Sequence, residues 1–409
     1  MAEGSFGPLA GVRVVDLTWM LAGPYCTMLL ADLGADVVKV ESPNGGDPMR
    51  DAGPFAPGDE LRAFGGYFQS VNRNKRSLVL DLKSEDGPVA LRRLAGDADV
   101  VVENFRAGVM ERLGVGYDVL RDESPRLVYA SIRGFGDPRA GRSPYVDRPA
   151  VDVTVQAMAG LMGITGPAPG QPLKAGPGIG DIFTAALAAV GILAAVLNAR
   201  ETGRGQYVDL AMYDAVLSLC ERIVYQYSYE GVVPQPQGNS HPLFCPFDIF
   251  PCADGFVSVD ASSDRQWRDL AAAMDRAELG GDGRFATMEA RRVNAPLIRE
   301  LVSAWTRDLT SAEVVAAVGD RVPIGPVNDV AAIFADPHAA ARGMLAEVEQ
   351  PGAPGPVVIA GTAIKLDETP GGVHRRAPLL GEHSREILAE AGFTPDEIHG
   401  LVEAGAVGR

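Results

Sequence analysis

The chain of 409 residues is poor in cysteine and unevenly supplied with histidine. Its cysteines, at positions 26, 220, 245 and 252, form neither a CxxC pair nor a zinc knuckle, and four are too few for a disulfide scaffold. We therefore expect reduced, mostly buried thiols. The first 240 residues contain no histidine. A Ser-His-Asp triad or a histidine-ligated metal site is disfavoured there unless His241 or His383 folds back, and we expect no bound metal.

Positive charge is also scarce. The net charge is −16 and the isoelectric point about 4.8, without the basic patch that a nucleic-acid-binding protein normally carries. No signal peptide is expected, because the sequence does not open with a basic start and an apolar core. The longest uncharged apolar stretch, residues 182–199, reaches the lower length limit for a membrane span, but its alanine content favours a buried core helix. We expect a cytoplasmic protein that binds neither nucleic acid nor membrane.

The composition is that of a globular protein, with 46% hydrophobic and 22% charged residues, in a chain long enough for two domains. Apolar runs typical of buried strands alternate with helical patterns along the first 140 residues. Strands are predicted at 12–17, 37–41, 77–82, 98–105 and 126–136, and helices at 21–33 and 88–95. This order indicates βαβ units in a doubly wound parallel sheet, which is the fold class α/β. Ligands of such sheets bind beyond the carboxyl ends of the strands.

The pattern changes in the second half of the chain. Glycine and proline predict an irregular segment at 163–181, followed by the helix 182–199 and by a strand that becomes a helix within 207–220. From about residue 226, short strands around the turn at 253–255 and then helices to about residue 320 indicate a smaller α+β domain. The remaining elements are predicted as a helix near 330–342, strand-like segments within 355–366 and a C-terminal helix.

Several cations lie at or beside the predicted strand ends. They are Lys75, Arg76, Lys83, Arg106, Arg112 and Arg133, with Arg148 in a following loop. Any one of them alone is better explained as a solvated surface charge. As a set at successive strand ends, they suit a polyphosphate ligand such as coenzyme A or a nucleotide.

Asp181 stands directly before the predicted long helix. The preceding Gly176, Gly178 and Gly180 do not have the spacing of a dinucleotide fingerprint, but they let the backbone approach a ligand closely. Asp181 alone is better explained as a helix N-cap than as a catalytic residue, although the two roles are compatible. Helix N–H groups and the helix dipole favour an ionised carboxylate, which is the form that a carboxylate nucleophile needs.

The sequence resembles the family III CoA transferases, the carnitine/bile-acid-inducible group that includes formyl-CoA transferase. The resemblance runs nearly end to end and is specific because many segments occur in the same order. These segments are LAGVRVVDLTWMLAGP (9–24), LGADVVKVE (33–41), NKRSLVLDLK (74–83), VVENFRAG (101–108), GIGD (178–181), TGRGQYVDLAMYDAVL (202–217), IGPV (324–327) and APLLGEHSREIL (377–388).

The resemblance implies an interlocked homodimer, in which each chain has a large domain built from both of its ends. The domains would be 1–225 for the first part of the large CoA-binding domain, 226–335 for the small domain, and 336–409 for a return segment completing the large domain. The partners would be an acyl-CoA, a small carboxylic acid and a second copy of the chain. The large doubly wound domain agrees with the strand and helix pattern above.

The resemblance also implies a mechanism with coenzyme A as co-substrate. The family's catalytic aspartate falls on Asp181, which would form mixed anhydrides and an aspartyl-CoA thioester with the substrates. The family's CoA contacts would fall on Leu21, Ala22, Ser42, Leu80, Lys83, Asn104, Phe105, Arg106, Arg112 and Arg148.

Two departures from the family pattern concern phosphate binding. Ser42 stands where relatives carry a phosphate-binding arginine, and Pro149 stands where formyl-CoA transferase has a lysine. Arg148 is a candidate replacement.

Two other functions stay open beside CoA transfer. The α-methylacyl-CoA racemases of the same family share the aspartate but add a histidine in a G-H-D-x-x-Y segment; Val151 stands in its place here and cannot exchange protons, which disfavours racemisation. A noncatalytic CoA- or nucleotide-binding protein is the third hypothesis. For the leading hypothesis, succinyl-CoA with a small dicarboxylic or hydroxy acid is our expected substrate pair.

Overall fold

The computed structural model describes residues 6–408, which divide into two compact units. The first unit contains the chain up to Leu161, then Ala175–Tyr225 and the chain from Pro337 onward. The second unit contains Met162–Lys174 and Gln226–Asp336. The domain boundaries given above stay a prediction, and the structure differs from them in grouping residues 162–174 with the second unit.

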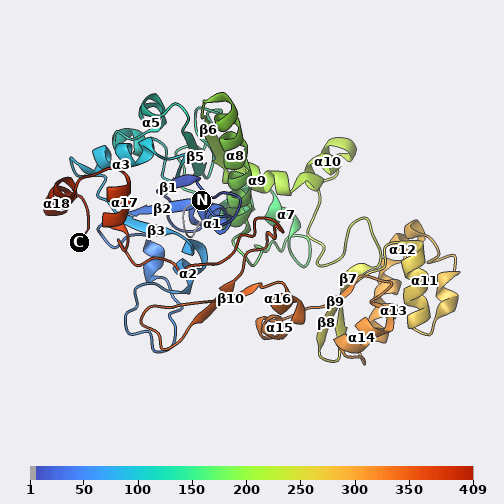
Figure 1. Ribbon diagram of the computed structural model, residues 1–409. Helices are drawn as coiled ribbons and strands as arrows, with labels where there is room; N and C mark the ends of the chain where they lie inside the picture. Colours follow the sequence, from blue (N-terminus) through green and yellow to red (C-terminus); the bar gives the residue numbers. More distant parts are fainter. Residues whose placement is uncertain (1–5, 409) are drawn as a thin grey trace. The chain divides into compact units, whose positions relative to one another are not determined.

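The first unit is built on a six-stranded parallel sheet, which confirms the α/β prediction (Figure 1). Its strands are β1 (Arg13–Asp16), β2 (Asp36–Glu41), β3 (Arg76–Val79), β4 (Val100–Glu103), β5 (Val128–Arg133) and β6 (Tyr207–Ala211). The spatial order is β3-β2-β1-β4-β5-β6, so the direction of winding reverses between β1 and β4. In such sheets the ligand crevice lies outside the carboxyl ends of the strands at this reversal.

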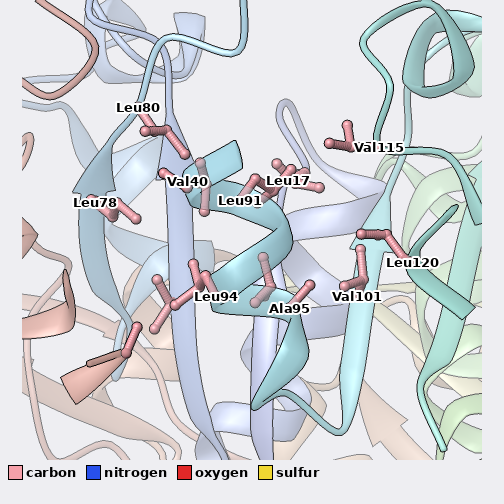
Figure 2. Close-up of a cluster of buried hydrophobic side chains, with 14 of the residues drawn as sticks. Leu17, Val40, Leu78, Leu80, Leu91, Leu94, Ala95, Val101, Val115 and Leu120 are labelled. Atoms are coloured by element: carbon pink, nitrogen blue, oxygen red, sulfur yellow. The ribbon is translucent and has the colours of Figure 1, made fainter. Parts of the chain in front are cut away.

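Helices cover both faces of the sheet. On one face lie α1 (Ala22–Asp32) and α8 (Ile179–Thr202), whose small residues pack on the valines that point toward them. On the other face lie α3 (Gly87–Gly96), α5 (Tyr117–Glu123), α17 (Ser384–Glu390) and α18 (Pro395–Glu403). Figure 2 shows this second core, with Leu91 and Leu94 of α3 between Val40 and Leu78 on one side and Val101 on the other. Adjacent strand residues serve opposite faces, as the two-residue period of a strand requires.

Helix α8 is longer than predicted and changes the setting of Asp181. It begins at Ile179 with Gly178 as its N-cap residue, so the irregular segment predicted at 163–181 was wrong at its C-terminal end. Its length and apolar composition would suffice to cross a membrane. In this unit α8 instead packs against α1, β5 and β6, as expected of a core helix.

Shorter elements complete the first unit. They are the 3-10 turn η1 (Pro48–Asp51) and the helices and strands α2 (Gly66–Asn72), α4 (Val109–Arg112), α6 (Asp152–Met158), α9 (Met212–Leu219), α16 (Pro337–Ala341), β10 (Leu345–Val348) and β11 (Val357–Ala360). Helices α7 (Leu161–Ile164) and α10 (Glu221–Glu230) straddle the boundaries between the units.

The C-terminal segment returns to the free edge of the sheet beside β3 (Figure 1). Arg76 of β3 forms ion pairs with Glu386 and Glu390 of α17, at 3.0 Å and 2.8 Å. The His383 Nδ1 atom, just before α17, accepts a hydrogen bond from the Ser77 backbone N–H. These contacts join the last part of the chain to a strand that lies more than 300 residues earlier, since the paired residues are 306 to 314 positions apart.

The second unit has its own core around a three-stranded antiparallel sheet. The sheet contains β7 (Phe247–Cys252), β8 (Gly255–Asp260) and β9 (Ile324–Pro326), and the predicted turn at 253–255 joins the first two. Its helices are α11 (Asp264–Ala273), α12 (Met288–Val293), α13 (Ala295–Thr306), α14 (Ser311–Val318) and α15 (Val330–Ala335), with the turn η2 (Ala277–Gly280). Pro337 divides the helix predicted at 330–342 into α15 and α16. All four cysteines of the chain are free.

Candidate active site

Asp181 lies in the first turn of α8, three residues after the N-cap Gly178. Burial and, to a smaller extent, the negative charge of Asp152 together raise the pKa of its carboxyl group to about 7. The helix N-terminus, which was expected to favour the ionised carboxylate, therefore does not dominate the pKa of this group. Desolvation and a like charge outweigh the helix dipole here, because the dipole contributes only a fraction of a unit charge.

The Asp181 carboxylate lacks a hydrogen-bond donor in the part of the chain that the structure describes. Among the residues that the structure describes, none donates a hydrogen bond to it, although it is half-buried. An N-cap carboxylate would accept backbone N–H bonds, so the N-cap interpretation fails. The oxygens of Asp181 remain available to react with a ligand.

Asp152 is the residue that sequence reasoning missed. It begins α6, where its Oδ1 accepts a hydrogen bond from the Gly180 backbone N–H at 2.7 Å and its Oδ2 accepts one from Gln156 Nε2 at 2.8 Å. Gln156 Oε1 in turn accepts from the Ala175 backbone N–H, at the start of the segment that leads into α8. Asp152 directly follows Val151, in the segment that was compared with the G-H-D-x-x-Y segment of the racemases. That comparison was the one sequence feature that could have pointed to Asp152.

Leu21 and Tyr67 form further parts of the surroundings of Asp181. A side-chain carbon added to Gly178 would lie 3.0 Å from Leu21 Cδ2 and 3.6 Å from Asp181 Oδ2, so these three residues are in close proximity. Burial raises the pKa of the Tyr67 phenol, and the charge of Asp181 adds to that rise. Tyr67, from α2, is therefore close enough to respond to the charge of Asp181, and its O–H is a hydrogen-bond donor at neutral pH.

The loop between β1 and α1, residues 17–21, meets the end of β4 at the reversal of the sheet. The Asn104 side chain accepts a hydrogen bond from the Trp19 backbone N–H at 3.1 Å and donates one to the Trp19 carbonyl at 2.8 Å. The Trp19 and Phe105 rings are 5.9 Å apart, and the Trp19 side chain is 43% exposed. The ligand crevice expected of this fold therefore has Leu21, Asn104 and Phe105 at its edge.

The other predicted CoA contacts lie on loops that follow the parallel strands at the same edge. Ser42 is exposed after β2, and its Oγ accepts a hydrogen bond from the Asn44 backbone N–H. Leu80 is buried after β3, whereas Lys83 is exposed in the next turn. Ala22 is buried in the first turn of α1. The strand order thus brings the loops after β3, β2, β1 and β4 together in one row.

The cations at the strand ends fall into two groups. Arg106, Arg112 and Arg148 are exposed, like Lys83, and the Arg148 guanidinium lies 4.4 Å from the centre of the Tyr145 ring. In contrast, the buried cations of the set are used within the protein. These are Lys75 with Asp16, Arg76 with Asp36, and Arg133 with Glu103.

Arg133 shows what the buried group does. Its Nη2 donates to Glu103 Oε1 at 2.8 Å, and its Nε donates to the Phe105 carbonyl at 3.1 Å. Arg133 therefore fixes the loop after β4 and is not available for a phosphate. Burial raises the pKa of Glu103 to about 7, although the charge of Arg133 opposes that rise.

A doubly wound sheet with a half-buried, unoccupied carboxylate beside its ligand crevice defines an α/β enzyme capable of covalent carboxylate catalysis. The chain belongs to CoA-transferase family III, whose sequence model matches residues 9–384. This match confirms the family that the sequence resemblance indicated.

Named relatives agree with this assignment. The chain is 52% identical over 389 residues to the succinyl-CoA:mesaconate CoA-transferase of Haloarcula hispanica, an alignment that covers 94% of this chain and 97% of that protein. It is 39% identical over 390 residues to the succinate–glutarate CoA-transferase of Agrobacterium fabrum, with 94% and 95% covered. A crystal structure of a CAIB/BAIF family protein from Brucella suis superimposes with a TM-score of 0.83 at 35% identity, covering 95% of this chain and all of that one. The protein is a CoA-transferase, which moves its co-substrate coenzyme A between an acyl-CoA and a free carboxylate.

Proposed function

We propose that Asp181 is the nucleophile of the transfer and that the acyl group and then coenzyme A pass through covalent adducts of its side chain. The observation that carries this proposal is the state of its carboxylate. It is half-buried, accepts no hydrogen bond from the described residues and has a pKa raised to about 7. A carboxylate that is poorly stabilised by its surroundings is more basic, and therefore more nucleophilic, than one in water.

The reaction begins when an ionised Asp181 oxygen attacks the thioester carbonyl of the donor acyl-CoA. The carbon–sulfur bond breaks, which yields a mixed anhydride and the CoA thiolate. The thiolate attacks the aspartyl carbonyl and expels the donor acid as its carboxylate, leaving an aspartyl-CoA thioester. The acceptor carboxylate attacks this thioester and releases the thiolate, giving a second anhydride. Attack of the thiolate on the acceptor carbonyl then forms the new acyl-CoA and restores Asp181. No proton is gained or lost overall.

Asp152 and Tyr67 have supporting roles in this proposal. Asp152 holds the Gly180 backbone N–H and contributes to the raised pKa of Asp181, so it both places and activates the nucleophile. The Tyr67 O–H, which is near the charge of Asp181, would donate a hydrogen bond to an oxygen that becomes negative during the attack.

The CoA would lie along the row of strand-end loops. The exposed cations Lys83, Arg106, Arg112 and Arg148 would neutralise its phosphates, and Leu21, Ala22, Ser42, Leu80, Asn104 and Phe105 would line its path, as the family resemblance implies. The side chain of Asn104 already binds the Trp19 backbone. Its contribution to CoA binding would therefore come through the position of the Trp19 loop.

For the substrates, we propose succinyl-CoA as donor and a small dicarboxylate, with mesaconate as the first to test, as acceptor. Support comes from the relatives, which are named for succinyl-CoA with mesaconate and for succinate with glutarate. A further relative from Chloroflexus aurantiacus, 36% identical, is named succinyl-CoA–D-citramalate CoA-transferase. The acids in these names are dicarboxylic, with or without a hydroxyl group.

The experiment is mass spectrometry of wild-type protein and an Asp181→Asn variant, each incubated with succinyl-CoA and a panel of dicarboxylic acids. We expect wild-type protein to produce a new acyl-CoA and to carry a CoA adduct on the peptide that contains Asp181. The variant keeps the shape of the side chain but cannot attack a thioester. We expect it to lose at least 1,000-fold in rate and to carry no adduct. Near-normal transfer by the variant would refute the proposed role of Asp181.

We also propose that two copies of the chain form the interlocked homodimer that the resemblance implies. Helices α10 and α15 contain no buried residue among those that the structure describes. Short helices gain most of their stability from burying an apolar face, so these two require a further surface to pack on. Tyr227 and Tyr229 of α10 and Phe334 of α15 are among the exposed side chains such a surface would cover. A sedimentation mass of twice 43.1 kDa would support the dimer, and a mass of 43.1 kDa would contradict it.

A further inference from the structure

The loop that leads from β1 into α1 is held by side chains from other elements. The Thr18 N–H donates to Asp16 Oδ1 at 2.9 Å, and the Thr18 carbonyl accepts from Lys39 Nζ at 2.7 Å. Asn104 holds both polar groups of Trp19, as described above. The Met20 N–H donates to Asp47 Oδ1 at 3.3 Å. The backbone of each of the three consecutive loop residues Thr18, Trp19 and Met20 is thus hydrogen-bonded to a side chain.

Met20 needs such support because of its backbone conformation. Its φ angle of 69° is in the left-handed region, which residues with a side chain rarely adopt. Its side chain and that of Trp19 are each 43% exposed, so neither is held in place by burial in the core. The conformation persists only if the surrounding structure determines it. The next residue, Leu21, is the one that lies close to Gly178 and Asp181.

Apart from Asn104, the side chains that hold the loop belong to a buried cluster of six charged groups. Three are acidic and three are basic, so the cluster is neutral as a whole. The members are Asp16, Lys39, Glu41, Asp47, Arg50 and Lys75, each at most 4% exposed. Lys75 binds Asp16 at 3.0 Å, and Arg50 binds Glu41 at 2.6 Å.

Lys39 has a distinct place in this cluster. Its side chain is fully buried, its Nζ lies 3.0 Å from Asp47 Oδ2, and it donates to the Thr18 carbonyl. Asp47 uses its other oxygen for the N–H groups of Met20 and Met49. The ion pair therefore joins two points of the loop, the Thr18 carbonyl and the Met20 N–H, through one pair of side chains.

Stability alone is a poor explanation for this arrangement. Removing two charges from water is so unfavourable that an apolar pair of similar size is often as stable as a buried ion pair. A buried ion pair does, however, fix geometry, because each charge is stable only where its partners are.

We propose that Lys39 and Asp47 are positioning residues, which hold the Thr18–Leu21 loop in the conformation that binds the CoA substrate beside Asp181. This inference rests on the proposed site of CoA binding along the strand ends. It predicts that the pair affects CoA affinity through the loop and that this effect is separable from any effect on folding.

The test uses Lys39→Met, Asp47→Asn and the double variant K39M/D47N in the full chain. The single variants leave one buried charge without its partner, so either could fail to fold. The double variant removes one charge of each sign and leaves Lys75 to pair with Asp16. Lys365→Met, at an exposed position, is the matched control. Three properties are measured: the Tm, the Kd for CoA itself, and the 19F NMR spectrum of protein labelled with 5-fluorotryptophan.

Fluorotryptophan is a suitable probe because the chain contains only three tryptophans, Trp19, Trp267 and Trp305. Only Trp19 belongs to the loop, and its signal is assigned by its disappearance in Trp19→Phe. For the double variant we expect a Tm close to that of the wild type, a Kd for CoA raised about tenfold, and a shifted or broadened Trp19 signal. The other two signals stay in place, and the control variant matches the wild type in all three properties.

Two results would overturn the proposal. One is a double variant that folds with an unchanged Trp19 signal and an unchanged Kd for CoA, which would make the pair a stabilising feature only. The other is a double variant in which all three tryptophan signals change together, which would indicate general unfolding. The proposed chemistry is tested separately, because Asp181→Asn is expected to abolish transfer while leaving the Trp19 signal in place.

Discussion

The pKa of Asp181 illustrates how competing effects at one residue are resolved. The start of α8 offers a partial positive charge, but Asp181 is half-buried and has Asp152 as its neighbour. Two carboxylates in proximity disfavour each other's ionisation, and burial disfavours the charge of either. The outcome is a pKa of about 7, so Asp181 changes its protonation state in the physiological range.

This pKa predicts the pH dependence of the reaction and the effect of Asp152→Asn. In the proposed mechanism only ionised Asp181 attacks the thioester, so kcat/KM should rise with pH and level off above about 7. Removing the negative charge of Asp152 favours ionisation of Asp181, which lowers its pKa. We expect the rising limb to move to lower pH by about one unit, because burial, the larger cause, remains. The measurement is kcat/KM for the acyl-CoA between pH 5 and 9.

Gln156→Met is the matched control for this variant. It removes the hydrogen bond from Gln156 to Asp152, which Asp152→Asn also disturbs, but it leaves the negative charge in place. Its rising limb should stay near that of the wild type. An unchanged limb in Asp152→Asn, or an equal shift in both variants, would argue against a charge effect of Asp152 on Asp181.

Basic residues near the ends of strands have different roles in this site, and the sequence alone could not tell the exposed ones from the buried ones. Lys83 and Arg106 follow strands and Arg133 ends one, yet only the first two are exposed. Arg133 is buried because Glu103, on the neighbouring strand β4, offers it a partner. Such pairings depend on which strands are adjacent, and this is a property of the sheet that local sequence does not contain.

At the scale of elements, the position of Asp181 is set by the contact between α6 and α8. Gly180 permits this contact because a side-chain carbon there would lie 2.7 Å from Val155 Cγ2 and 3.0 Å from Asp152 Oδ1. Its N–H also makes the bond to Asp152. Glycine is unfavourable inside a helix, so its presence one residue before Asp181 reflects the close approach of α6.

Gly180→Ala should therefore lower activity without unfolding the protein. The methyl group forces α6 and α8 apart by a fraction of an ångström to about an ångström, and the alignment of Asp152 with Asp181 is lost. We expect kcat/KM to fall by about 100-fold, the effect of a misplacement of that size. Steady-state kinetics and the circular dichroism spectrum measure the two properties.

Gly400→Ala in α18 is the control for a helical glycine with open space around it, since nothing lies within 4 Å of the added carbon. It should leave activity unchanged and stabilise the fold by about 0.5–1 kcal/mol. If Gly180→Ala were as active as this control, the contact between α6 and α8 would not be important for the reaction.

The strands were predictable as elements, whereas the start of α8 was not. The parallel strands β1, β2 and β4 are buried on both faces, so they appear in the sequence as continuous apolar runs. The glycines before Asp181 suggested a loop from their low helix propensity alone. Their actual environment depends on α6, because the Asp152–Gly180 bond joins residues 28 positions apart. The sequence did not point to Asp152 for the same reason, because its contact with Gly180 is distant along the chain.

At the scale of the whole molecule, most of the second unit is an insertion within the sequence of the first. The chain leaves the sheet unit after Tyr225 and returns to it at Pro337, so the second unit is inserted between two parts of the first. The return is secured by ion pairs of α17 with Arg76 and by the pairing of Leu80 with Val407. The interlocked homodimer proposed above requires that both ends of the chain belong to one unit in this way.

Subunit exchange distinguishes an interlocked dimer from one that is held by surface contacts alone. Interlocked chains cannot separate unless one of them opens, so a tagged and an untagged dimer mixed under native conditions should form no hybrid, even after days at high dilution. Denaturing the mixture and refolding it should produce hybrids, detected by native mass spectrometry. For the control, a protease site is inserted in the exposed segment at Val232 and Val233, which follows α10 near the start of the main part of the second unit. Cleavage there interrupts the chain, and hybrids should then form without denaturation. Rapid exchange between uncleaved dimers would show that the chains are not interlocked.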